Sequence, residues 1–148
     1  MERKPKYLLL QTNCGFNDIL CSIQTHLKYC KRFNRILLVN GMHSLYGINL
    51  ANYFQGGEEE KAFLIFDTNK IREIIRADES MTVYPAEFDL QSVMDDKQVI
   101  IQRDRIELTE DYEETIVVNR YTLGGNGFPL FKTWTLINEP FKLLEKQI

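Results

Sequence analysis

The first third of the chain places two short apolar runs on either side of one amphipathic stretch. Residues 7–11 are mostly apolar without alternation, and residues 35–39 form a second such run. Runs of this kind are typical of parallel strands covered on both faces. Between them, apolar side chains recur at spacings of four and three, which places them on one face of a helix: Phe16, Leu20, Ile23, Leu27 and Cys30. The pattern predicts a strand–helix–strand unit of about 33 residues.

The polar loop at residues 12–18 joins the first strand to the helix. Gly15 permits a positive φ or a close approach of the backbone. We interpret Asn17 as the N-cap, with Asp18 at the positive end of the helix dipole. Asn13 and Asn17 can hydrogen-bond sugar hydroxyls or phosphate, the helix start adds unpaired N–H groups, and Asp18 can act as a base. A capped tight turn without any ligand explains the same residues equally well.

The remainder of the chain predicts further short elements. Residues 43–55 suggest helical turns or a loop at the sheet edge, and residues 69–76 a helix with its isoleucines on one side. A closing helix is expected at residues 141–148, with proline in its first turn. Strands are expected at 82–84, 99–102 and 116–118, and residues 63–66 suit a strand or a buried helix edge. The order predicts one α/β domain over residues 1–148, a Rossmann-like three-layer fold with a mostly parallel sheet.

Composition fits this picture and adds an uneven distribution of charge. Of the 148 residues, 44% are hydrophobic and 26% are charged, which is ordinary for a globular domain with a real core. Residues 1–40 carry seven Lys and Arg against two Asp and Glu, whereas the remainder is acidic. A basic first unit favours a phosphate-bearing ligand. We prefer the simpler interpretation that the basic residues solvate the end of the helix: Lys28, Lys31, Arg32 and Arg35.

Several classes of protein are disfavoured. The three cysteines, Cys14, Cys21 and Cys30, form no CxxC pair, so we expect neither a zinc site nor a disulfide framework. Reduced thiols suit a cytoplasmic protein. No run approaches about 18 apolar residues, so no membrane span is expected. Basic stripes with interleaved aromatics are also missing, which argues against nucleic-acid binding.

The segment from Cys14 to Val39 resembles the amino-terminal part of the fucosyltransferase-like glycosyltransferases. The shared features are the loop Gly15-Phe16-Asn17-Asp18 and the sequence FNRILLV at residues 33–39. LANYF at residues 50–54 is similar to a following element of that family, so the resemblance covers about the first 55 residues. It implies a GT-B fold, in which two Rossmann-like domains face across a cleft and the first domain shapes the acceptor side.

The resemblance also implies a reaction. A sugar such as fucose would pass from a nucleotide sugar, for example GDP-fucose, to a glycan acceptor in polysaccharide biosynthesis, with no metal or other cofactor. Asn17 and Asp18 would be the catalytic residues, contacting the acceptor or deprotonating its hydroxyl. Asn13, Gly15 and Phe16 would contribute to substrate binding.

The chain departs from the family in two respects. Cys14 and Asp18 stand where the family usually has a second glycine and a glutamine. The H-x-R-x-x-D pattern of the donor-binding half has no counterpart, since neither His26 nor His43 begins it. The resemblance therefore implies an acceptor-side domain with little activity alone. Its donor-binding half would be a further domain or a partner chain, or would have been lost. A homo-oligomer is the alternative to a separate donor-binding partner.

Other candidate residues carry weaker signals. Arg120 follows a predicted strand and can pair with a phosphate in the same cleft. The glycine-rich residues 124–127 suit a turn better than a phosphate cradle. His43, Tyr46 and Tyr53 can contact a sugar, although packing explains them better. His26 is expected on the exposed side of the helix.

Two other functional classes remain open on the sequence. One is a non-catalytic binding or assembly module that keeps the α/β fold. The other is a small flavodoxin-like protein that binds a nucleotide or phosphate group. Binding of FMN would identify the flavodoxin-like class, whereas binding of GDP would favour the transferase.

Overall fold

The structure is a computed structural model that describes residues 4–12, 16–41, 49–52, 54–57, 61–84, 86, 110–121 and 141–143. Only the backbone is described at residues 12, 16–21, 54–56, 120–121 and 141–143. The elements in chain order are β1 (Lys6–Thr12), α1 (Phe16–Phe33), β2 (Arg35–Val39), η2 (Leu50–Asn52), β3 (Phe54–Gly56), β4 (Leu64–Ile65), α2 (Thr68–Arg76), β5 (Val83–Tyr84), β6 (Ile116–Tyr121) and β7 (Phe141–Leu143).

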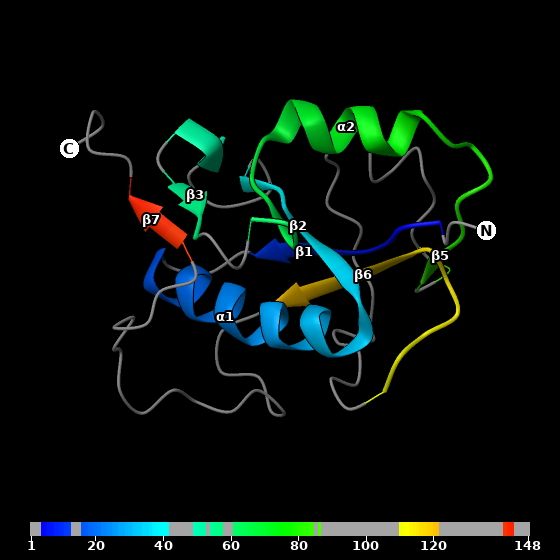
Figure 1. Cartoon of the computed structure of the whole chain (residues 1–148), viewed down its shortest axis with the longest axis horizontal. Helices are drawn as coiled ribbons and strands as arrows, with labels where there is room; N and C mark the ends of the chain where they lie inside the picture. Colours follow the sequence, from blue (N-terminus) through cyan, green and yellow to red (C-terminus); the bar gives the residue numbers. More distant parts are fainter. Residues whose placement is uncertain are drawn as a thin grey trace.

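Five strands form one parallel sheet in the order β4-β2-β1-β6-β5 (Figure 1). β1 lies at its centre and pairs with β2 on one side and β6 on the other. The predicted strand–helix–strand unit is confirmed, because β1 and β2 are parallel neighbours joined by α1. β3 and β7 form a separate antiparallel pair.

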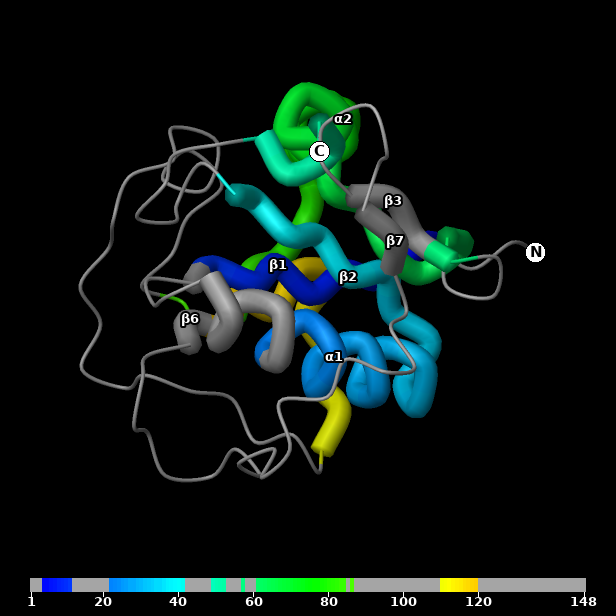
Figure 2. Tube along the Cα trace, turned by 90° about the vertical axis from the view of Figure 1, so that its left-hand side faces the viewer, coloured from blue at the N-terminus to red at the C-terminus, as the bar shows by residue number. Residues whose placement is uncertain are grey.

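Helices α1 and α2 cover opposite faces of this sheet (Figures 1 and 2). Leu8 and Leu10 point to the face where Ile23 and Leu27 of α1 pack. Leu9 points to the other face, against Ile71 and Ile75 of α2. This period-two alternation within an uninterrupted apolar run is what a strand buried on both faces requires. The fold is therefore a three-layer, Rossmann-like α/β arrangement, as the sequence predicted.

The strand order identifies where the chain changes direction in the sheet. From β1 the described chain moves outward through β2 to β4, and it then crosses to β5 and β6 on the other side of β1. If the described strands of this sheet are numbered along the chain (β1, β2, β4, β5, β6), their order across the sheet is third, second, first, fifth, fourth. The first three follow the Rossmann pattern, whereas a flavodoxin sheet has its third strand beside the first. The switch point lies between β1 and β6, and ligands of open α/β sheets bind at the carboxyl ends of such strands.

Three local predictions are wrong. The closing helix expected at residues 141–148 is instead strand β7 over Phe141–Leu143, because its backbone pairs with β3. β3 itself was expected to be loop or helical turn, although the neighbouring turn η2 is confirmed as helical. Helix α1 begins at Phe16, so Asn17 lies in its first turn and is not the N-cap.

The short strands and the second helix agree with the sequence. Residues 63–66 contain strand β4, and β5, β6 and α2 lie where strands and a helix were predicted. β6 extends through Tyr121, so Arg120 is part of the strand and does not follow it. The strand predicted at residues 99–102 and the glycine-rich residues 124–127 lie outside the described residues.

Candidate functional site

The carboxyl ends of β1 and β6 meet at the switch point of the sheet. Gln11 is the register partner of Arg120, and Thr12 is the partner of Tyr121. α1 begins only four positions after Thr12, so its first turn starts at the same edge. The structure thus places the backbone of Arg120 beside the end of the strand that leads into the predicted loop.

The predicted site residues are described to different extents. Phe16, Asn17 and Asp18 lie in the first turn of α1 and Arg120 in β6, but their side chains lie outside the description. Asn13, Gly15, His43, Tyr46 and Tyr53 lie outside the described residues altogether. Convergence of these side chains on one substrate therefore remains a prediction.

Buried polar side chains gather where the central strands end. The middles of β1 and β2 are apolar. Buried polar residues occupy the carboxyl ends of the central strands and the helices that face the strands: Gln11, Asn40, Thr68, Asn119 and His26. Buried polar groups need partners, and none of these five lacks one. The carboxyl edge is therefore internally bonded as well as polar.

His26 is fully buried between α1 and β6, contrary to the expectation that it is exposed. Its Nδ1 lies 2.7 Å from the carbonyl oxygen of Ser22, so Nδ1 carries the proton and donates it. Nε2 then accepts a hydrogen bond from the side-chain amide of Asn119. Burial lowers the pKa of His26 to about 4, against a smaller rise caused by the Ser22 carbonyl. The imidazole is neutral at pH 7 and holds Asn119, one residue before Arg120.

A second row of polar residues on α1 could have revealed this burial. Ser22, His26 and Tyr29 follow a spacing of four and three, beside the predicted apolar stripe, and all three are buried. The buried face of α1 is therefore wider than its apolar residues suggest. A polar residue that follows this spacing next to the stripe belongs to the packed face.

The amino terminus of α2 is already occupied by the protein's own carboxylate. Asp67 caps the helix, and its Oδ1 accepts the N–H of Asn69 at 3.0 Å. The side-chain oxygen of Asn49 accepts the N–H of Thr68 at 3.3 Å, and the Asn49 amide donates to Asp67 at 3.3 Å. A bound anion would have to displace Asp67 from these donors. The start of α2 is therefore not open to an anion.

Replacing Asp67 with alanine is expected to lower the free energy of unfolding by about 1 kcal/mol, the usual cost of losing an N-cap. Urea unfolding of the wild-type chain and the variant measures this difference. Asn69→Ala is the matched control, because only the backbone N–H of Asn69 takes part in the cap. An equal loss in both variants would contradict the capping role.

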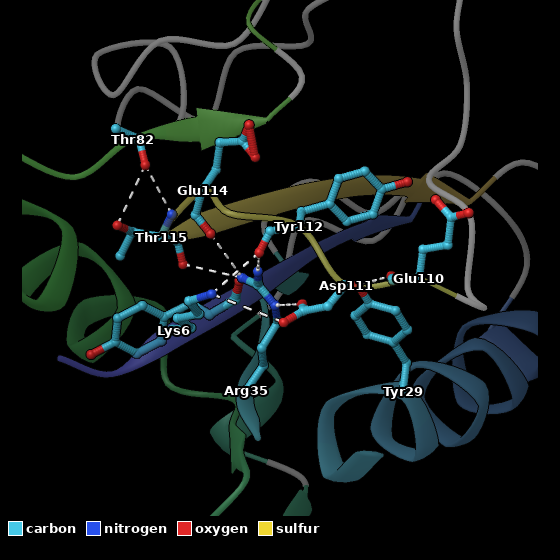
Figure 3. Close-up of polar contacts among 10 residues, drawn as sticks. Lys6, Tyr29, Arg35, Thr82, Glu110, Asp111, Tyr112, Glu114 and Thr115 are labelled. Carbon is cyan, nitrogen blue, oxygen red and sulfur yellow. Dashed lines mark hydrogen bonds and ion pairs between the residues drawn. The ribbon is translucent and has the colours of Figure 1, made fainter. Parts of the chain in front are cut away.

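Arg35 is also buried, contrary to the expectation that it solvates the end of the helix; Lys28, Lys31 and Arg32 are exposed as expected. Figure 3 shows its guanidinium among residues of the 110–115 segment. Nε donates to Asp111 Oδ1 at 2.9 Å, and Nη2 donates to the carbonyl of Tyr112 at 2.6 Å. Nη1 donates to the carbonyls of Tyr7, Glu114 and Thr115 at 3.0, 3.1 and 3.4 Å.

This cluster belongs to the opposite edge of the sheet from the switch point. Arg35 begins β2, and the 110–115 segment leads directly into β6. The guanidinium therefore fixes the entry of β6 beside β1. Tyr29 adds a second tie, since its hydroxyl donates to the carbonyl of Glu110 at 2.7 Å. Within the FNRILLV motif, Arg35 thus contributes to the fold and is not placed for chemistry at the carboxyl edge.

Metal binding and membrane spans can be considered for the described residues. These residues contain no cluster of three or more His, Cys, Asp or Glu side chains that is arranged to hold a metal ion. Within the same residues, no helix has the length and apolar character needed to cross a membrane. Cys30 is a free, buried thiol in the core, and burial raises its pKa, partly offset by the nearby Arg35.

Comparisons of the chain with protein-family models, with curated proteins and with solved structures find no match. The function of the chain is therefore inferred from its own residues and fold.

Proposed function

We propose that this chain is the acceptor-side domain of a fucosyltransferase-like glycosyltransferase of GT-B type. It would take part in transferring a sugar from a nucleotide sugar to a glycan acceptor, together with a donor-binding domain or partner chain. The observation that carries the proposal is the register pairing of Gln11 with Arg120 at the switch point. This pairing brings a cationic residue of β6 to the edge from which the loop at residues 13–15 and α1 begin.

The proposed chemistry uses the first turn of α1. The carboxylate of Asp18 would accept the proton of an acceptor hydroxyl while that oxygen forms a bond to the anomeric carbon. The bond from the anomeric carbon to the nucleotide diphosphate breaks, and the diphosphate leaves with the electron pair. Asn17 would hold the acceptor hydroxyl, and Arg120 would neutralise charge on the phosphate. Asn13, Gly15, Phe16 and His43 would complete the substrate contacts.

Two features of the described fold support this arrangement over the alternatives. The strand order β4-β2-β1 is that of a Rossmann half and differs from the flavodoxin order. The start of α2 is filled by Asp67, so the proposal places an anionic or sugar ligand at the start of α1. The buried, reduced Cys30 suits the cytoplasmic location that the proposal includes.

We expect the isolated chain to transfer little or no sugar. The sequence contains no H-x-R-x-x-D pattern, so the arginine with which the resembled family holds the donor diphosphate has no counterpart, and Arg120 is a weaker substitute. A mass-spectrometric assay with GDP-fucose and glycan acceptors measures this. Robust turnover by the isolated chain would show that the donor site is complete here and would overturn the assignment to an acceptor-side domain.

Calorimetric titration with GDP, UDP and FMN separates the three functional classes. We expect weak binding of GDP or UDP, which Arg120→Ala weakens by about tenfold because one cation–phosphate contact is lost. Arg76→Ala is the control, since Arg76 is an exposed arginine at the end of α2. Binding of FMN alone would favour the flavodoxin-like class. No binding of any of the three would favour the non-catalytic assembly module.

A further inference from the structure

A hollow of about 740 Å³ opens at the amino edge of the sheet. The residues that line it include Lys4, Lys6, Phe33, Ile36, Ala62 and Phe63. They come from the chain before β1, the end of α1, the start of β2 and the approach to β4. This volume lies within the range of about 300–1,000 Å³ that is usual for small-molecule sites.

The hollow is separate from the carboxyl edge. β1 has seven residues, so its two ends lie about 20 Å apart. Lys6 is at the start of β1, whereas the predicted loop follows its end. A small ligand at one edge therefore cannot contact the other, and this hollow is independent of the proposed glycosyltransferase site.

The backbone at the end of α1 shapes one wall. Asn34 has a φ of 54°, a left-handed conformation that asparagine tolerates better than most residues. It turns the chain sharply from Phe33 into β2. Phe33 and Phe63 are both only partly buried and line the same hollow, together with Ile36. The wall is thus apolar and includes two aromatic rings.

Among the described residues, two lysines and one carboxylate line the rim: Lys4, Lys6 and Asp111. Asp111 already accepts from the buried Arg35 at 2.9 Å, so its charge is largely neutralised before Lys6 is counted. Lys6 Nζ lies 3.9 Å from the other oxygen of Asp111, and Lys4 Nζ lies 3.7 Å from Asp78. The Lys4 side chain is 78% exposed, and such long surface pairs are weak. The Lys4 ammonium can therefore turn to an anion in the hollow at little cost. Lys6 Nζ also donates to the Tyr112 carbonyl at 3.3 Å, so an anion would pair with it where it stands.

We propose that this amino-edge hollow binds a small aromatic anion. The aromatic ring lies against Phe33 and Phe63, and the anionic group pairs with Lys4 and Lys6. Ring contacts and an ion pair are both needed, because neither an exposed ion pair nor a half-open apolar wall gives useful affinity alone. Lysine is a point charge without the fork geometry of arginine, so the site accepts carboxylate, sulfonate or phosphate.

Three matched probes test both halves of this proposal on the whole chain. The first, 8-anilinonaphthalene-1-sulfonate, has both an aromatic ring system and a sulfonate. The second, N-phenyl-1-naphthylamine, has the same ring system without the sulfonate. The third, methanesulfonate, has the sulfonate without the rings. We expect the aromatic sulfonate to bind about tenfold or more tightly than either half. Amide NMR spectra should place its shifts at the lining residues that carry an N–H, which include Lys4, Lys6, Phe33 and Phe63. Shifts confined to other residues, or equal affinity for the uncharged ring, would overturn the proposal.

Two variants separate the charge from the cavity. The double variant Lys4→Gln, Lys6→Gln should weaken the aromatic sulfonate about tenfold and leave the uncharged ring unchanged. Ala62→Trp should weaken both, because the exposed Ala62 lines the hollow and a larger side chain there fills it. Lys70→Gln is the control, because it removes one positive charge at an exposed position of α2. It should leave the affinities for both ring probes unchanged. Unchanged affinities in the first two variants would also overturn the proposal.

Discussion

Replacing Arg35 with methionine is expected to lower the free energy of unfolding by about 3–5 kcal/mol. The guanidinium is fully buried, and this single group donates hydrogen bonds to one carboxylate and four backbone carbonyls. Methionine keeps much of the apolar stem but donates nothing, so these buried acceptors lose a charged partner. Urea unfolding at neutral pH measures the difference.

Three further variants show how much each residue of this cluster contributes to the free energy of unfolding. Arg32→Met should cost well under 1 kcal/mol, because Arg32 is exposed and contacts only the face of the Phe33 ring among the described interactions. Arg35→Lys should recover little, since one ammonium cannot span the carboxylate and the carbonyls together. Asp111→Asn should cost less than Arg35→Met, because Asp111 is a third exposed and Arg35 keeps its carbonyl partners. Similar losses in Arg35→Met and Arg32→Met would contradict a structural role for Arg35.

The same cluster shows what sequence patterns can and cannot predict. The β1–α1–β2 unit was predictable because its signals are local: two apolar runs and one helical stripe within about 33 residues. The burial of Arg35 was not, because its carboxylate partner Asp111 lies 76 positions away. In the sequence Arg35 follows Lys28, Lys31 and Arg32, which are exposed, and this local context suggested that Arg35 is exposed as well.

His26 and β7 were misjudged for a related reason. Asn119, the partner of His26, is 93 positions distant, and β7 owes its strand conformation to pairing with β3. Each depends on a contact that only the folded chain brings together. Long-range pairing therefore overrode the local propensities for an exposed histidine and a terminal helix.

The backbone arrangement around the candidate site was predictable, whereas the site itself stays a prediction. A polar loop after the first strand predicts a carboxyl-edge site because parallel strands end together. The structure agrees at the level of the backbone, since Arg120 pairs with Gln11. The roles of Asn17 and Asp18 depend on side-chain directions, which neither the sequence pattern nor the described backbone specifies.

The stability of the fold should fall by about 3 kcal/mol as the pH drops from 6.5 to 4, because of His26 alone. Its pKa is 6.5 when exposed and about 4 when buried in the fold. Between pH 6.5 and 4, His26 is protonated in the unfolded chain and neutral in the folded chain. Stability from this group is therefore complete above pH 6.5, declines as the pH falls to about 4, and is constant at lower pH.

Asp111 acts in a lower pH range and can be separated from His26. Partial burial raises its pKa, but the Tyr112 N–H, Arg35 and Lys6 together hold the pKa below the usual 3.8. Its stabilisation is present above pH 3.8 and is lost as the pH falls through the lower value in the folded chain. Among the described residues with a shifted pKa, His26 is the one whose titration lies between pH 6.5 and 4.

His26→Gln tests the assignment, because glutamine can still donate to Ser22 and accept from Asn119 but does not titrate. Urea unfolding from pH 7 to 4 should lose the histidine-dependent slope in this variant. The chain has only one other histidine, so His43→Gln is the matched control and should keep the slope. In the wild-type chain the imidazole NMR shifts of His26 should stay constant from pH 7 to about 5, since the folded ring titrates only near 4. A folded-state midpoint near 6.5 would mean that the ring reaches water, and the buried His26–Asn119 pair would then have to be rejected.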